Sequence, residues 1–116
     1  MIGLLDAADA HHTRAVAELK RAGSSDRLLL AASAYAEALV KPLRDGYGEL
    51  VDRFVERSLV EVVPIDRATA KAAASLRARH RVLRLGDALV LASARAHAAE
   101  LLTFDDRLRR ISREVR

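Results

Sequence analysis

Residues 84–105 read RLGDALVLASARAHAAELLTFD, and this stretch decides the fold. After Arg84 and Leu85 comes a Gly-Asp pair, followed by an Ala-rich segment and a short apolar run before Thr103 and Asp105. Alanine favours helix, and a short apolar run after a helix is typical of a buried strand in a parallel sheet. We therefore predict a helix over residues 86–98 and a strand over residues 101–103.

The same alternation of helix and strand extends through the rest of the chain. Apolar runs predict strands at 28–31 and 59–63, and capping residues with helical spacing predict helices at 9–21, 33–43, 49–57, 68–80 and 105–111. Ser33 and Asp66 are the expected N-caps of two of these helices, and Glu114 with Val115 is expected to begin another strand. Strands separated by helices predict one α/β domain over residues 1–116, with a parallel sheet covered on both faces.

The composition alone excludes several kinds of site and chemistry. A chain of 116 residues suits a single domain, and the absence of cysteine excludes disulfides, cysteine zinc sites and thiol catalysis. The N-terminus lacks the basic start of a signal peptide, and no run reaches the ~18 apolar residues of a membrane span. We expect a soluble, cytoplasmic protein with no membrane association.

The net charge is +4, and nearly all of the basic residues are arginine. Arginine binds phosphate bidentately and stacks on bases, which suits an RNA partner. Codon bias in a GC-rich genome would raise arginine and alanine together, and the two explanations are compatible.

Three acids occupy apolar segments, where an unpaired charge is costly: Glu37, Asp87 and Asp105. Asp105 follows a predicted strand, Glu37 lies one turn into the helix after residues 28–31, and Asp87 opens a helix. Ligands of parallel sheets bind beyond the carboxyl ends of the strands, so all three can reach one edge. Together they would suit Mg²⁺ or Mn²⁺, which can activate water for phosphodiester cleavage.

Each acid also has a structural alternative. Asp87 and Asp105 are both at positions where a helix N-cap is common. Glu37 could be a solvated surface residue. The sequence leaves these alternatives open.

The chain resembles PIN domains, and specifically the VapC-type toxins of bacterial type II toxin–antitoxin systems. The resemblance covers nearly the whole chain and rests on residues 8–12, Ser-Ala-Tyr-Ala-Glu-Ala-Leu at 33–39, residues 84–94, and Leu-Leu-Thr-Phe-Asp-Asp-Arg-Leu at 101–108. It implies a three-layer α/β/α fold with a short, mostly parallel sheet. It also implies that Glu37, Asp87 and Asp105 are metal ligands and that Thr103 is a supporting hydroxyl.

The resemblance implies a function as well. A relative of this kind would be a Mg²⁺- or Mn²⁺-dependent endoribonuclease, would form a homodimer, and would be silenced by a VapB-type antitoxin. The basic stretch of Arg77, Arg79, Arg81 and Arg84 could contact RNA phosphates. A solvated basic loop explains the same four residues equally well.

One departure concerns the start of the chain. The family usually opens with a central strand that ends in an Asp, followed by Ser or Thr, and this Asp is the first metal ligand. Either the chain begins just after that strand and lacks the ligand, or residues 2–5 are a shortened strand and Asp6 takes its place. We expect the first, with the central strand absent.

The absence of the central strand would have consequences for stability and function. It would lower stability, because buried backbone groups would lose their hydrogen-bond partners. It would also favour a second function, a degenerate PIN-like binding module without catalysis. A plain Ala-rich α/β domain with surface acids is the third possibility.

Overall fold

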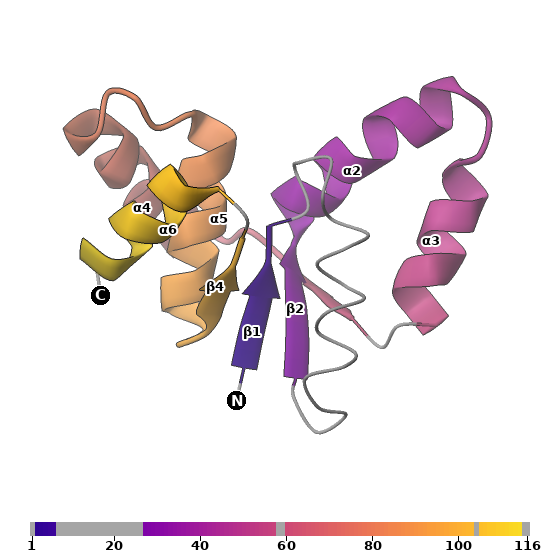
Figure 1. The fold of residues 1–116 in the computed structure, drawn as a ribbon, viewed down its shortest axis with the longest axis horizontal. Coiled ribbons are helices and arrows are strands. Elements are labelled where there is room, and N and C mark those ends of the chain that lie inside the picture. Colours follow the sequence, from indigo (N-terminus) through magenta and orange to yellow (C-terminus); the bar gives the residue numbers. More distant parts are fainter. Residues whose placement is uncertain (1, 7–26, 58–59, 104, 115–116) are drawn as a thin grey trace.

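Four parallel strands form one sheet in the computed structural model, which describes residues 2–6, 27–57, 60–103 and 105–114. The strand order is β3-β2-β1-β4 (Figure 1). The strands are β1 (Ile2–Leu5), β2 (Arg27–Ala31), β3 (Glu61–Val63) and β4 (Glu100–Leu102). Every neighbouring pair is parallel, which confirms the predicted α/β class and the parallel sheet.

The first strand is present, and our expectation that it is absent was wrong. β1 lies between β2 and β4, with Leu4 paired to Leu29 on one side and to Leu101 on the other. Leu4 is completely buried, because both of its strand neighbours and the helices cover it. Four residues therefore suffice to make a central strand, and Asp6 follows directly at its carboxyl end.

The helices agree with the predicted ones to within a few residues at most ends. They are α2 (Ala32–Arg44), α3 (Gly48–Arg57), α4 (Arg67–Arg79), α5 (Leu85–Ala96) and α6 (Asp106–Glu114). Most boundaries differ by one or two residues, as at β3, which begins at Glu61 rather than at residue 59. The largest difference is at α6, which continues to Glu114, where we predicted a strand. The predicted helix at 9–21 and the rest of the predicted last strand lie outside the described residues.

The two predicted N-caps had different outcomes. Asp66 caps α4, since its Oδ1 accepts a hydrogen bond from the Thr69 amide at 2.8 Å. Ser33 does not cap α2: the N-cap is Ala31, and Ser33 lies inside the first turn. Its buried hydroxyl oxygen has no hydrogen-bond partner among the described residues.

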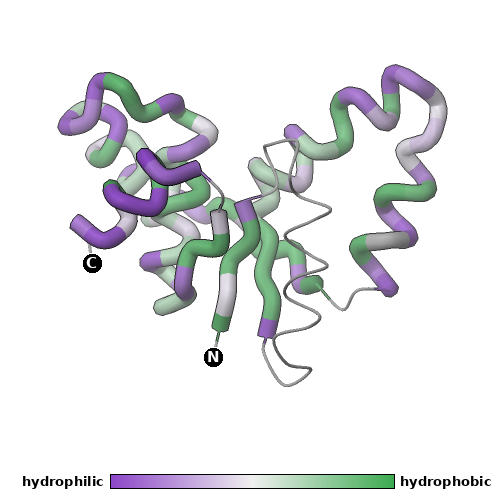
Figure 2. Tube along the Cα trace, in the orientation of Figure 1, coloured by the Kyte–Doolittle hydropathy of each residue, from purple (hydrophilic) through white to green (hydrophobic). Residues whose placement is uncertain are grey.

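The helices divide into two groups around the sheet. α4, α5 and α6 gather beside β4, whereas α2 and α3 extend from the other side of β1 and β2 (Figure 1). The core joins sheet and helices through large side chains that are almost fully buried: Leu4, Leu29, Leu76, Leu91 and Leu108. The strands are accordingly the most apolar part of the trace in Figure 2. In the described part of the chain, no helix combines the length and apolarity needed to cross a bilayer.

Candidate active site

The carboxyl ends of β1 and β4 bring two polar residues together. Leu5 is paired with Leu102, so the next residues, Asp6 and Thr103, leave the sheet at the same edge. The Asp6 amide donates to the Leu102 carbonyl at 3.0 Å, and the Thr103 hydroxyl donates to Asp6 Oδ2 at 2.7 Å. Both side chains are buried, and the hydroxyl offsets part of the cost of burying a carboxylate.

Asp105 joins this pair through the same hydroxyl. Its amide donates to Thr103 Oγ1 at 3.1 Å, so Thr103 connects Asp6 with Asp105. Asp105 is also the cap of α6, because its Oδ1 accepts from the Leu108 amide at 3.1 Å. The capping alternative is therefore confirmed for Asp105, and the capping hydrogen bond is accepted by Oδ1 of its carboxylate.

Asp87 is not a helix cap. The N-cap of α5 is Arg84, and Asp87 lies half-buried in the first turn of the helix. An acid at this position interacts favourably with the positive end of the helix dipole. Its carboxylate therefore lies near the beginning of α5 without a capping role.

Glu37 reaches from α2 to the beginning of α5. A side chain at Gly86 would collide with Glu37 Oε1, so the carboxylate lies directly against the glycine. Partial burial raises the pKa of Glu37 above its ordinary value of 4.5, the charges of Asp87 and Asp6 raise it further, and Arg84 lowers it. The Glu37 residue is exposed as a whole, as the surface alternative supposed, but its carboxylate interacts with two other acids.

Two kinds of interaction thus connect the acids. Electrostatic repulsion connects Glu37 with Asp87 and Asp6, and hydrogen bonds connect Asp6 with Asp105 through Thr103. Carboxylate oxygens are hard donors that suit Mg²⁺ or Mn²⁺, and a cation would relieve their repulsion. As the side chains are placed, the described residues include no group of three His, Cys, Asp or Glu that could hold a metal ion. The donor chemistry therefore fits a cation, while the carboxylates must move closer together to bind one.

The four arginines that the sequence suggested lie in different places. Arg84 precedes α5, and its charge acts on Glu37. Arg77 and Arg79 are in the last turn of α4, and Arg81 lies in the loop between the two helices. All four are exposed, and only Arg84 has an electrostatic effect on Glu37.

Two contacts near the acids were not anticipated from the sequence. Gly86 provides the space for the Glu37 carboxylate. Arg109 donates from Nη2 to the Thr103 carbonyl at 2.5 Å, and its Nη1 lies 3.5 Å from Asp106 Oδ1. The adjacency of Gly86 to Asp87 was a usable signal, whereas the contact of Arg109 depends on how the chain turns after β4.

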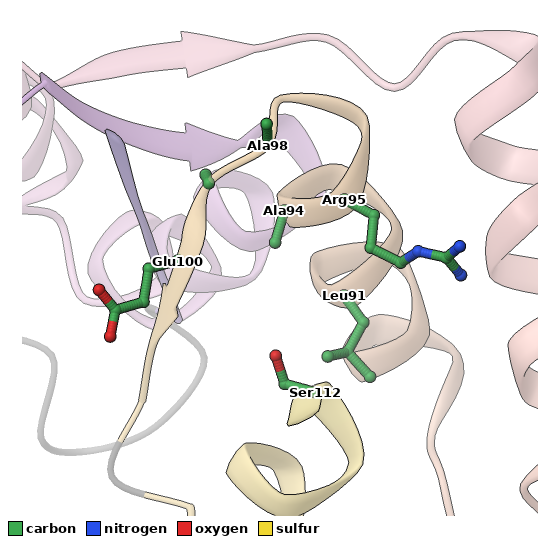
Figure 3. Close-up of a pocket in the computed structure, with 7 residues that line it drawn as sticks. Leu91, Ala94, Arg95, Ala98, Glu100 and Ser112 are labelled. Carbon is green, nitrogen blue, oxygen red and sulfur yellow. The ribbon is translucent and has the colours of Figure 1, made fainter. Parts of the chain in front are cut away.

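Figure 3 shows a cavity of about 570 Å³. It is lined by Leu91, Ala94, Arg95, Ala98, Ala99, Glu100 and Ser112. These residues come mainly from the last turns of α5 and the start of β4, whereas Asp87 and Thr103 are at the opposite ends of these elements. The cavity is therefore separate from the candidate site.

The comparisons with known proteins agree with the fold. The sequence model of the PIN domain family matches residues 1–114. A solved chain from a toxin–antitoxin complex of Klebsiella pneumoniae has a similar fold, with a TM-score of 0.70 and 20% sequence identity over 85% of this chain and 82% of that chain. A search of curated proteins gave no match.

Proposed function

This chain belongs to the PIN domain family, and from that premise we propose that it is a metal-dependent endoribonuclease, the toxin of a VapBC-type toxin–antitoxin system. The reaction is hydrolysis of RNA phosphodiester bonds, and the cofactor is Mg²⁺ or Mn²⁺. The observation that carries the proposal is the chain of hydrogen bonds from Asp6 through Thr103 to Asp105 at the carboxyl ends of β1 and β4.

Four carboxylates are proposed to hold the cation: Asp6, Glu37, Asp87 and Asp105. A bound divalent ion supplies positive charge that stabilises the reacting phosphodiester and activates water. Thr103 holds the Asp6 carboxylate in one orientation, because it donates to Oδ2 while it accepts from the Asp105 amide. Glu37 and Asp87 bring negative charge to the beginning of α5, and Arg84 offsets part of it.

The partners follow from the same premise. The fold resembles that of a chain in a toxin–antitoxin complex, which supports a VapB-type antitoxin as the protein partner. RNA is the substrate, and the exposed arginines Arg77, Arg79, Arg81 and Arg84 are proposed to contact its phosphates. We further propose that the protein forms a homodimer and acts in the cytoplasm.

The rival function, a binding module without catalysis, has lost its main support. It depended on the absence of the first strand and of the first acid. β1 is present in the middle of the sheet, and Asp6 is buried at its end with a hydrogen bond from Thr103. The nuclease is therefore the better proposal.

The experiment is cleavage of a mixed RNA pool by the parent and by Asp87→Ala. We expect the parent to cut RNA in Mn²⁺ or Mg²⁺ but not in EDTA. We expect no cutting by the variant, because it lacks one of the four proposed metal ligands. The substitution removes no large buried side chain, so the variant should still fold. Circular dichroism checks that the variant is folded. If Asp87→Ala cuts as fast as the parent in the presence of metal, this mechanism is wrong.

A further inference from the structure

Three arginine side chains on α6 line one hollow at the surface. The hollow has a volume of about 330 Å³ and is bordered by Asp106, Arg109, Arg110 and Arg113. These residues share one face of the helix, since they are three or four positions apart. With three positive charges against one negative charge, the hollow attracts anions.

The hollow begins next to the candidate active site. α6 starts at Asp106, the residue after Asp105. Arg109 donates to the carbonyl of Thr103, whose hydroxyl donates to Asp6. The near end of the hollow is thus one residue along the chain from Asp105.

The arginines differ in how far they are engaged within the protein. Arg109 is held by the Thr103 carbonyl and lies near Asp106. Arg110 and Arg113 are exposed, and neither forms an ion pair with another described residue. The buried residues of α6 are Leu108 and Ile111, so the helix is fixed to the core on one face and presents arginine on another.

We propose that Arg110 and Arg113, with Arg109 at the near end, bind the phosphate backbone of an RNA strand whose cleaved bond lies at the carboxylates. The inference rests on the proposed function and adds a substrate-binding surface to it. Arginine suits this role, since its planar guanidinium binds phosphate through two parallel hydrogen bonds. Arg109 and Arg113 are one turn apart, about 6 Å along the helix axis, so their head groups can contact neighbouring phosphates.

The test is binding of a fluorescein-labelled single-stranded RNA in EDTA, measured by anisotropy over a range of NaCl concentrations. The parent is compared with the double variant Arg110→Gln/Arg113→Gln and with a control, Arg53→Gln/Arg57→Gln. The control arginines are exposed on α3, and the two variants change the net charge equally. Thermal melting followed by circular dichroism checks that all three proteins are folded.

We expect the α6 variant to lose at least tenfold in affinity and the control to lose much less. The slope of log K against log salt should fall by about 1.4 in the α6 variant, since each phosphate contact on single-stranded RNA contributes about 0.7. Equal losses in the two variants would mean that net charge alone is responsible and would overturn the proposal. Failure of the folded parent to bind the RNA would overturn it as well.

Cleavage of the same RNA in Mn²⁺ separates this inference from the proposed function. If the parent cleaves and the α6 variant binds and cleaves as the parent does, the arginine surface is wrong and the nuclease proposal stands. If no protein cleaves but only the α6 variant loses binding, the nuclease proposal is wrong and the arginine surface stands.

Discussion

At the scale of single residues, Glu37 is an acid whose environment disfavours its charged form. Partial burial is the main cause of its raised pKa, and the charges of Asp87 and Asp6 add to it. A carboxylate held in such a place lowers stability while it is ionised and metal-free. Acids that repel one another are the arrangement that a divalent cation would stabilise, so the cost to folding and the capacity to bind metal have the same origin.

The raised pKa of Glu37 predicts a pH dependence. Between the unfolded and the raised folded value, the folded state binds more protons, so stability falls as pH rises through this window. Glu37→Gln removes that fall. In EDTA, we expect the variant to have a larger free energy of unfolding than the parent above the window, and the difference to disappear below about pH 4.5.

Urea unfolding at a series of pH values measures this difference. Glu114→Gln, an exposed acid at the end of α6, is the control and should follow the parent at every pH. A difference between Glu37→Gln and the parent that does not change with pH would show that Glu37 is not responsible.

The position of Gly86 beside Glu37 predicts that Gly86→Ala, a substitution that usually stabilises helices, weakens metal binding. Alanine is preferred to glycine in a helix by about 1 kcal/mol, but a Cβ at Gly86 would collide with Glu37 Oε1. The carboxylate must then move. We expect Gly86→Ala to weaken Mn²⁺ binding by about tenfold or more, the scale seen when residues that orient metal ligands are changed.

Isothermal titration calorimetry measures the Mn²⁺ affinity. The matched control is Gly48→Ala, at the start of α3, where the added carbon would meet the side chain of Leu43. Leu43 is 64% exposed and can move aside. Unchanged Mn²⁺ affinity in Gly86→Ala would contradict a role for the glycine in placing Glu37.

At the scale of elements, β1 determines whether the site can form. It places Asp6 beside Thr103 and supplies the strand to which both β2 and β4 pair.

We expect Leu4→Ala to lower the free energy of unfolding by about 2–5 kcal/mol, because the side chain is fully buried. Leu50→Ala on α3 is the control, at a side chain that is 63% exposed, and should change stability by less than about 0.5 kcal/mol.

Denaturant unfolding of the two variants compares these costs. If Leu4→Ala costs no more than Leu50→Ala, β1 is not a central strand in solution.

Most elements could be predicted from the sequence because their signals are local. The cap at Asp66 and the apolar run of β2 lie within the segments that they define. β1 gave a weaker signal, since it has four residues and one of them is glycine. Its place in the sheet depends on pairing with β4, which comes almost 100 residues later, and no local pattern contains that information.

The residues of the candidate site also differ in whether a local sequence pattern could indicate them. Glu37, Asp87 and Asp105 could be singled out because each is an acid in an apolar segment. The sequence offered Asp6 only as the less favoured of two alternatives, because its place beside Thr103 depends on a hydrogen bond between residues 97 positions apart. The Arg109 contact with Thr103 likewise depends on a turn that the sequence does not specify.

At the scale of the whole molecule, the proposed site is assembled from four separated segments. The end of β1, the second turn of α2, the first turn of α5 and the residues after β4 each contribute one acid. The net charge of +4 favours a polyanionic partner in general, and the arginine face of α6 gives that charge a position next to the acids. One sheet therefore brings together the carboxylates and the surface proposed to hold the RNA.

The most direct test of this account is the rate at which labelled RNA is cut in Mn²⁺ by the parent and by Asp6→Asn. The side-chain carbonyl that this substitution introduces can still accept the hydrogen bond from Thr103, so the fold should persist in a melting experiment, while the negative charge is lost. We expect cutting by Asp6→Asn to fall to the level of the parent in EDTA. Cutting at the parent rate by a folded Asp6→Asn would show that the carboxylate at the end of β1 is not part of the active site.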